Sequence, residues 1–465
     1  MSTDIQGAIE PSAAVAAARE RAEAEAAEQA AVVPEPKYRH LPSGSLEDPA
    51  NWQEIRDLFT IVPDHMHLNA GTMGSAPKPV LDVLGAADRQ YAARPADPYP
   101  PTTLAETRGV LARSYGCDFD EIAVVQGAAD GNARILNGID LEPGDEVLTT
   151  THECYTMHAP LNVLHNRRGI VVTKLTPPLG PDTSADEIVE MFASAITSRT
   201  KVIEWAGVTF TVGTRFPTRA LAELAHRHGL ISIVDGAHLP GQFELNLHET
   251  GVDFFSGSGA KYQCGPMGTG ILYARNKVLP EYNPLPLPRF WPVISLWYPV
   301  EGVLPPRTTG REHTSDVATL LQKTGSADLS RGPALQAARE IWDRIGQRNI
   351  ETYVLGLSRH LKQRIVDHWG PEALYSPWHD ERLHSGIVAF QPFTDERLAA
   401  DPRTFVEFEE RMEREYGINL RFTFFPVRDS AREHYAVRLA PHLYNNHDEM
   451  DRAADALIKL TKEMS

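Results

Sequence analysis

The chain has 465 residues, of which 42% are apolar and 23% are charged, and this composition is typical of a globular protein with a large buried core. The formal net charge of −17 argues against nucleic acid or an anionic membrane as a partner, because both bind basic surfaces. No apolar run is long enough to span a membrane. The three cysteines, Cys117, Cys154 and Cys264, are too scattered for a disulfide framework or a zinc site, so we expect a protein of the reducing cytoplasm without a metal.

Residues 1–45 form an extension rich in alanine and glutamate, which ends near Pro34 and Pro36. The extension lacks the basic stretch and the apolar stretch of a secretory signal. We expect it to be loosely helical or disordered, with a partner-binding helix as the alternative.

From about Glu121 onward, short apolar runs alternate with helical patterns. The runs are IAVVQG, EVLTTT, IVVTKL, KVIEWAGV, LISIVDGA and GILYAR. Nearly continuous apolar strands separated by helices predict a mostly parallel sheet that is covered on both faces. We therefore assign residues 46–332 to a large α/β domain.

Residues 279–322 interrupt this alternation with a segment rich in proline and aromatic residues, LPEYNPLPLPRFWPVISLWYP. Proline at this density excludes a regular helix or a central strand. A functional lid and a stiff surface excursion explain the segment equally well. The helical pattern after Pro333 and the strands SGIVAFQPF, INLRFTFFP and YAVRLAP then predict a smaller α+β domain over residues 333–465.

Two polar residues follow neighbouring apolar runs of the predicted sheet. Asp235 ends the run LISIVD, and Lys261 lies in the glycine-rich stretch SGSGAKYQCGPMGTG after the next run. In open α/β sheets, ligands bind outside the carboxyl ends of the strands, and glycine lets the backbone approach a ligand closely. A lysine that forms a Schiff base and an acid that protonates a pyridine ring are what pyridoxal phosphate requires.

A phosphate group would fit the turn in VVQGAADGNARIL, where Gly127, Ala128 and Ala129 lead from a strand into a helix. Small residues at a helix N-terminus expose backbone N–H groups to an anion, and the helix dipole favours negative charge there. Such a turn alone is a weak signal. The order of phosphate turn, acid and lysine along the chain predicts a pyridoxal-phosphate site.

Several longer motifs resemble the class V aminotransferase family of fold-type I pyridoxal-phosphate enzymes, and its isopenicillin N epimerase-like branch in particular. The motifs are HLNAGTMGSAPKPVLDVL, GAADGNARILNGIDLEPGDEVLTT, VDGAHLPG, KYQCGPMGTGILY, KTGSAD and VRLAPHLYNNHDEMDR. The resemblance implies a large domain with a mostly parallel sheet of the seven-stranded type and a smaller α+β C-terminal domain. It also implies a homodimer whose active sites lie between the subunits.

The resemblance further implies roles for individual residues. Lys261 would form the Schiff base and shuttle a proton at the substrate Cα, Asp235 would pair with the pyridine nitrogen, and Arg438 would bind the substrate α-carboxylate with help from Asn69. A planar guanidinium suits this task because it matches a carboxylate bidentately. The remaining cofactor contacts would come from His238 near the ring hydroxyl, from Thr209, Ser258 and the backbone of Ala128 and Ala129, and from Gly325 and Ser326 of a neighbouring subunit.

The stretch THECYTMH departs from the family pattern, in which an acidic residue is followed by an aromatic residue that stacks on the ring. That position falls on Cys154 or Tyr155, and we favour Tyr155 because an aromatic face stacks better on a pyridine. His152 and His158 are candidate bases, although a lone histidine is more often structural. The residue before the lysine is Ala260, where the family has histidine.

No cysteine lies shortly before Arg438, where related desulfurases carry their nucleophile, so sulfur transfer is disfavoured. We expect an enzyme of specialised metabolism that acts at the Cα of an amino-acid-type substrate. The favoured reactions are elimination of the C–S lyase type and dioxygen-dependent oxidative decarboxylation or deamination. An aminotransferase, an epimerase and a non-catalytic pyridoxal-phosphate-binding module are the alternatives.

Overall fold

The structure is a computed structural model that describes residues 41–93, 104–275, 290, 317–322, 330–428, 430 and 432–465. Nearly all of the N-terminal extension, most of the 279–322 insertion and the KTGSAD segment lie outside these described residues. No helix among the described residues is long and apolar enough to cross a membrane.

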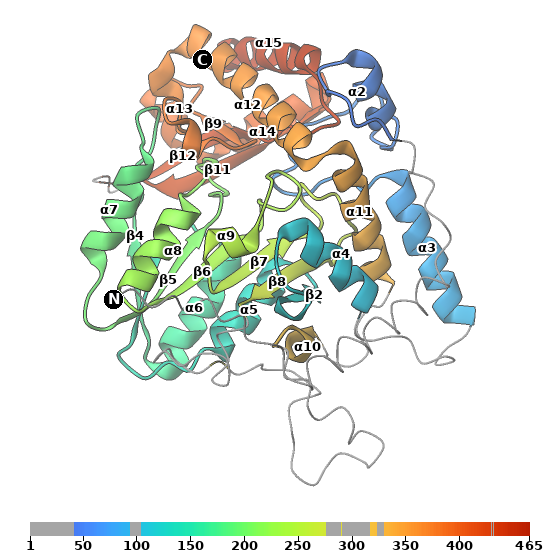
Figure 1. The fold of residues 1–465 in the computed structure, drawn as a ribbon. Helices are drawn as coiled ribbons and strands as arrows, with labels where there is room; N and C mark the ends of the chain where they lie inside the picture. The colour runs from blue at the N-terminus through green and yellow to red at the C-terminus, as the bar shows by residue number, and fades with distance from the viewer. Residues whose placement is uncertain are drawn as a thin grey trace, which may run out of the picture.

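A seven-stranded sheet forms the centre of the molecule, with the strand order β2-β8-β7-β6-β5-β3-β4 (Figure 1). β8 runs antiparallel to both of its neighbours, and all other neighbouring pairs are parallel. The predicted α/β fold with a mostly parallel sheet is therefore confirmed. The strands are β2 (Ile122–Val125), β3 (Glu146–Thr150), β4 (Val171–Leu175), β5 (Thr200–Ala206), β6 (Ile231–Gly236), β7 (Phe254–Ser258) and β8 (Gly270–Ala274).

Helices cover both faces of this sheet, because its strands bury side chains on both sides. Trp205 of β5 packs with α7 and α8 in one core, whereas its neighbour Glu204 points to the opposite face. On that opposite face, apolar residues of β5, β6 and β7 pack with α5, α6 and α10. The helices of this part are α3 (Lys78–Ala93), α4 (Ala105–Tyr115), α5 (Ala128–Gly138), α6 (Tyr155–Arg168), α7 (Ala185–Ala195), α8 (Thr218–Arg227), α9 (Leu247–Thr250), α10 (Val317–Gln322) and α11 (Arg331–Ile345).

The C-terminal part of the chain builds a three-stranded antiparallel sheet of order β11-β12-β9, with helices packed around it (Figure 1). The predicted strands correspond to β9 (Val388–Phe390), β10 (Ile418–Asn419), β11 (Arg421–Pro426) and β12 (Glu433–Leu439). The helices are α12 (Gln347–Trp369), α13 (Glu396–Ala400), α14 (Pro402–Tyr416) and α15 (His447–Met464). The division of the chain at residue 333 into two folding units stays a prediction.

The segment after α2 (Pro49–Arg56) joins the N-terminal and C-terminal parts of the chain. β1 (Met66–His67) pairs in parallel with β10, and a further bridge joins Asn69 to Ala440. This pairing brings residues 69–72 next to β12. The polar side chains of Asn69 and Thr72 in this segment therefore contact Arg438 of the C-terminal sheet.

Candidate active site

Lys261 follows β7 and lies beside His238, which follows β6. The Lys261 Nζ is 3.0 Å from His238 Nε2. His238 Nε2 is also 2.9 Å from the carbonyl oxygen of Gly71. Burial lowers the pKa of His238 well below its usual value, so the imidazole is neutral. Burial also lowers the pKa of Lys261 to about 8, although the charge of Asp235 acts in the opposite direction. The lysine amine is therefore more readily deprotonated than an ordinary surface lysine.

Asp235 lies at the end of β6 and is buried. Its Oδ2 accepts a hydrogen bond from Asn132 Nδ2 at 2.9 Å, and its Oδ1 accepts one from the N–H of Ala237 at 2.9 Å. Burial raises the pKa of Asp235, while these hydrogen bonds and the charge of Lys261 lower it. The donors identify the charged carboxylate as the form that this site is built to hold.

Two further buried acids, Glu153 and Glu204, lie behind Asp235, and the sequence analysis did not assign them a role. Glu153 accepts from the N–H of Ala206, and Glu204 accepts from the hydroxyl of Thr149. The second carboxyl oxygen of each acid has no hydrogen-bond partner among the described residues. Burial, together with nearby negative charge, raises the pKa of both carboxyl groups well above its usual value, which favours their neutral forms. A lone acid in the apolar run KVIEWAGV was the signal that could have revealed Glu204.

Arg438 of β12 is buried at the junction of the two sheets. Its Nη1 donates to the carbonyl oxygen of Phe210 at 2.8 Å, and its Nη2 donates to Asn69 Oδ1 at 3.0 Å and to Thr72 Oγ1 at 2.7 Å. Its Nε has no hydrogen-bond partner, and the guanidinium forms no ion pair with a carboxylate of the described chain. Burial lowers its pKa to about 10, so it remains a cation at neutral pH. A buried cation without a counter-ion is suited to bind an anionic ligand.

The expected phosphate turn lies at the same edge of the sheet. Gly127 precedes α5 with φ 144° and ψ 173°, and a side chain at this position would meet open space. The Ser256 hydroxyl donates to the carbonyl oxygen of Ala128 at 3.0 Å, which ties the start of α5 to β7. Ser258 is buried at the end of β7, and its hydroxyl accepts from the N–H of Ala260 at 3.2 Å. The first turn of α5, which includes the exposed Ala129, thus offers free N–H groups near the lysine loop.

The candidate ring-stacking and base residues in the stretch THECYTMH differ in burial and in their distance from Lys261. Cys154 caps α6 and lies close enough to Lys261 and Arg438 to affect the pKa of both, whereas the Tyr155 side chain is 75% exposed in the single subunit. His152 is buried, and the pKa of its ring is lowered to about 4 by burial.

Both nitrogens of His152 are engaged, at 3.0 Å from the carbonyl oxygen of Pro426 and at 3.0 Å from the Thr211 hydroxyl. His152 therefore joins the loop after β3 to β11 of the C-terminal sheet. His158 lies 2.9 Å from the carbonyl oxygen of Thr150, and the Thr209 hydroxyl accepts from the N–H of Thr214 at 3.0 Å. These contacts fix the loops around the site.

The structure thus brings Lys261, Asp235, His238, Asn69 and Arg438 together from segments that are far apart in the sequence. The predicted phosphate contacts Gly325 and Ser326 lie outside the described residues, as does most of the aromatic insertion.

The residues present fit pyridoxal phosphate. One edge of the sheet carries a lysine with a lowered pKa, a buried carboxylate held by two donors and an open helix N-terminus, which are the groups that this cofactor requires. The Nε of the buried Arg438 has no hydrogen-bond partner among the described residues and could bind an anionic group. This fold and this site define a pyridoxal-phosphate-dependent enzyme of fold type I.

Comparison with known proteins agrees with this class. Residues 96–288 match the model of the family described as Aminotransferase class-V. The chain resembles this family over that range, and its cofactor is pyridoxal phosphate.

Two kinds of relative are similar to the chain in sequence. It is 27% identical to an isopenicillin N epimerase from Streptomyces clavuligerus over 419 residues, which are 89% of this chain and 99% of the relative. It is 26% identical to a cysteine desulfurase from Haloferax volcanii over 324 residues, which are 69% of each chain. The resemblance stated from the motifs is therefore confirmed.

Solved structures also share the fold. The apo cysteine desulfurase from Thermococcus onnurineus NA1 superimposes with a TM-score of 0.70 at 19% identity and covers 88% of this chain and 98% of its own. A mutant of C-DES with glycine covalently linked to its PLP cofactor has the same TM-score and identity and covers 87% of this chain and 98% of its own. These likenesses establish the fold and not the reaction.

Proposed function

We propose that this enzyme removes the α-proton of an amino-acid-type substrate whose carboxylate is bound by Arg438. The observation that carries the proposal is the buried guanidinium of Arg438, which has a free Nε and no counter-ion among the described residues. A substrate carboxylate would supply the missing charge. Asn69 and Thr72 hold the guanidinium in place by accepting from Nη2.

The chain's own groups would then act on the substrate as follows. Bound pyridoxal phosphate supplies an electron sink for the charge that is left at Cα. Asp235 would keep the pyridine nitrogen protonated, because two donors hold its carboxylate in the charged form. Lys261 would accept the α-proton at Nζ, which its lowered pKa favours. The neutral His238 lies 3.0 Å from Nζ and would orient the amine.

For the step after proton removal, we propose elimination of a β-substituent. The Cα–H bond breaks with its proton on Lys261, and the Cβ–substituent bond breaks as the substituent leaves with the electron pair. With dioxygen as co-reactant, oxidative decarboxylation or deamination of the same substrate is the other reaction that we favour. Transamination stays an alternative, as does a module that binds the cofactor without catalysis. The enzyme would act in specialised metabolism in the cytoplasm, with a small-molecule substrate and without nucleic acid or membrane.

Epimerisation at Cα is the second candidate function. The relative described as isopenicillin N epimerase matches over 99% of its own length, whereas the desulfurase from Haloferax volcanii matches over 69%. An epimerase needs the same α-proton removal and differs in the face on which the proton returns.

The test is to incubate the purified protein with a panel of amino acids and amino-acid conjugates in deuterated water, with and without oxygen. Mass spectrometry separates the outcomes. A keto acid with a lost β-substituent supports elimination, oxygen-dependent loss of carbon dioxide supports oxidation, and deuterated substrate of inverted configuration supports epimerisation. Protein that binds the cofactor but exchanges no α-proton across the panel would overturn the proposal.

Borohydride reduction followed by peptide mapping tests the lysine directly. We expect the reduced cofactor adduct on Lys261 and its loss in Lys261→Ala, while Lys174→Ala at an exposed lysine retains it. An adduct on another lysine would contradict the site assignment.

A further inference from the structure

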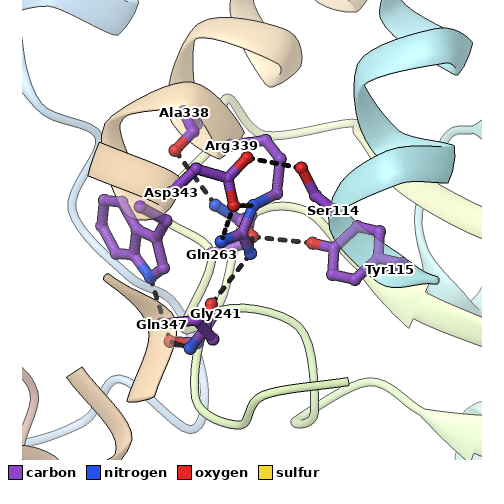
Figure 2. A network of polar contacts seen from close by, with 9 residues as sticks. Ser114, Tyr115, Gly241, Gln263, Ala338, Arg339, Asp343 and Gln347 are labelled. Carbon is purple, nitrogen blue, oxygen red and sulfur yellow. Dashed lines mark hydrogen bonds and ion pairs between the residues drawn. The ribbon is translucent and has the colours of Figure 1, made fainter. Parts of the chain in front are cut away.

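A buried polar network holds the loop that carries Lys261. Gln263 is fully buried two residues after the lysine, and its Oε1 accepts from Tyr115 Oη at 2.7 Å and from Arg339 Nη1 at 3.0 Å. Its Nε2 donates to the carbonyl oxygen of Ala338 at 3.1 Å. Figure 2 shows these groups converging on Gln263 from α4 and α11.

Arg339 is the centre of this network and is 1% exposed. Besides its bond to Gln263, the guanidinium donates from Nη1 to Gln347 Oε1 at 2.9 Å and from Nη2 to Asp343 Oδ1 at 2.7 Å (Figure 2). Asp343 in turn accepts from the Ser114 hydroxyl. The network therefore joins the end of α4, the length of α11 and the start of α12.

A second set of hydrogen bonds holds the peptide of Gly241 against the same loop. Trp342 Nε1 and Gln347 Nε2 both donate to the carbonyl oxygen of Gly241, at 2.9 and 3.1 Å. Gly241 has φ +81°, and a side chain there would lie 2.3 Å from the backbone N of Gln263. Only glycine allows this approach, which packs the held peptide directly against the residues after Lys261.

The backbone on both sides of Lys261 is also held. The carbonyl oxygen of Ala260 accepts from the N–H of Gly74 at 2.9 Å, and the carbonyl oxygen of Tyr262 lies 2.7 Å from His442 Nε2. The Gln263 side chain therefore completes a set of contacts that leaves this backbone little freedom.

We propose that Gln263, Tyr115 and Arg339 form a positioning network that holds Lys261 in the geometry needed to bind the cofactor. A buried amide is costly unless its donors and acceptors are satisfied, so it tolerates only the arrangement in which α4 and α11 supply their groups. An apolar side chain at this position would impose no such geometry. The inference rests on the proposed role of Lys261.

The main test compares Gln263→Leu in the lysine loop with Gln336→Leu on α11, the helix that also carries Arg339. Gln336 joins α11 to α4 through Thr107 at 3.2 Å and Glu106 at 3.1 Å, but it does not contact the lysine loop. We expect Gln263→Leu to raise the Kd of the apo-protein for pyridoxal 5′-phosphate on the order of tenfold, because a hydrogen bond to a charged group is lost. The Kd of Gln336→Leu should stay within about threefold of the parent, as expected for a group away from the site.

A second readout separates positioning from stability. The pH midpoint of the visible absorbance of the lysine-bound cofactor should shift in Gln263→Leu and not in Gln336→Leu, whereas both variants lower Tm. Gln263→Glu keeps the oxygen that accepts from Tyr115 and Arg339 but loses the donation to Ala338, so it should restore the Kd and the midpoint only in part. If Gln263→Leu lowers Tm but leaves Kd and midpoint unchanged, or if both variants change Kd equally, the proposal is overturned.

Should Gln263→Leu fail to fold, Tyr115→Phe removes one hydroxyl from the network at almost constant volume. We expect a rise in the cofactor Kd of about threefold, since a single neutral hydrogen bond is lost, with a shifted absorbance midpoint. Parental values for both quantities would overturn the proposal. Failure of the network is distinct from failure of the proposed function, because the latter is decided by which lysine of the parent protein carries the reduced cofactor.

Discussion

Among single residues, burial has a larger effect on the chemistry of this site than neighbouring charge does. Burial is the largest influence on the pKa of Lys261, His238 and Arg438, and it lowers each of them. The same influence raises the pKa of the acids beneath them. A neutral imidazole, a reactive amine and a guanidinium without a counter-ion among the described residues therefore lie close together in this site.

The first prediction concerns Arg438→Lys. Lysine keeps the charge but loses the planar fork, so substrate affinity should fall on the order of tenfold or more. Cofactor binding should be unchanged, because we assign Arg438 to the substrate. Titrations with substrate and with pyridoxal 5′-phosphate measure the two effects, and Arg403→Lys at an exposed arginine is the control. Equal substrate affinity in variant and parent would mean that another group binds the carboxylate.

The second prediction concerns Glu204→Gln, because glutamine mimics the neutral acid. The folded-state pKa of Glu204 is raised, so the folded protein holds a proton that the unfolded chain releases above its ordinary range. The parent therefore loses stability as pH rises, and the variant does not share this loss. Urea unfolding at increasing pH should show a growing advantage of Glu204→Gln over the parent.

Glu407→Gln, at an exposed glutamate, should show no such trend. An advantage of Glu204→Gln that shrinks with pH would mean that Glu204 is charged in the folded protein.

Among elements, α12 buries a lysine whose desolvation lowers the stability of the folded protein, and the amphipathic pattern of the helix does not reveal this. Lys362 lies on its buried face, and its Nζ donates to the carbonyl oxygen of Pro377 at 2.8 Å. Burial lowers the pKa of this lysine to about 7. The helix therefore packs with a lysine that is readily deprotonated in the folded protein at neutral pH.

The third prediction follows for Lys362→Met, which keeps the length of the side chain and removes the titration. The folded lysine binds fewer protons than the unfolded one between its lowered and its ordinary pKa, so the parent gains stability as pH rises through that window. Lys362→Met should therefore stabilise the protein by up to about 4 kcal/mol at acidic pH, and its advantage should disappear toward alkaline pH.

Unfolding measured by denaturant across this pH range checks the prediction. Lys462→Met, at an exposed position of α15, is the control and should follow the parent at every pH. An advantage of Lys362→Met that is constant with pH would show that the lysine does not titrate in the folded protein.

For the whole molecule, we predict a homodimer in which Gly325 and Ser326 of one subunit reach the phosphate of the other. Lys261→Ala and Gly325→Asp should each abolish cofactor-dependent activity alone. When the two variants are mixed and their subunits exchange, about half of the dimers contain one subunit of each variant. One of the two sites in each mixed dimer is intact, so about a quarter of the parental activity should return. Size-exclusion chromatography and the activity of the mixture are the measurements.

Exchange of Lys261→Ala with unaltered subunits controls for subunit mixing. If the Lys261→Ala and Gly325→Asp mixture stays inactive while that control exchanges, the two residues act in the same subunit's site.

The sequence by itself determined the fold class, the lysine loop and the family resemblance. Apolar runs such as LISIVDGA predict buried parallel strands, because strands covered on both faces lack alternation. Asp235 and Lys261 could be predicted to meet, since both follow strands of one parallel sheet, whose carboxyl ends share an edge. The local sequence pattern is enough to predict the positions of these two residues, because each position depends only on the strand that precedes the residue.

Only the tertiary structure decided which side chains lack or share partners. The buried acids near Asp235, the Arg438 site and the Gln263 network depend on contacts between segments that lie 53 to 369 residues apart in the sequence. The stacking of Tyr155 on the ring, which the sequence favoured, stays a prediction, because its side chain is exposed in this chain and Cys154 is near enough to influence the pKa of Lys261. Burial and long-range hydrogen bonding arise from packing of the whole chain, so no local pattern encodes them.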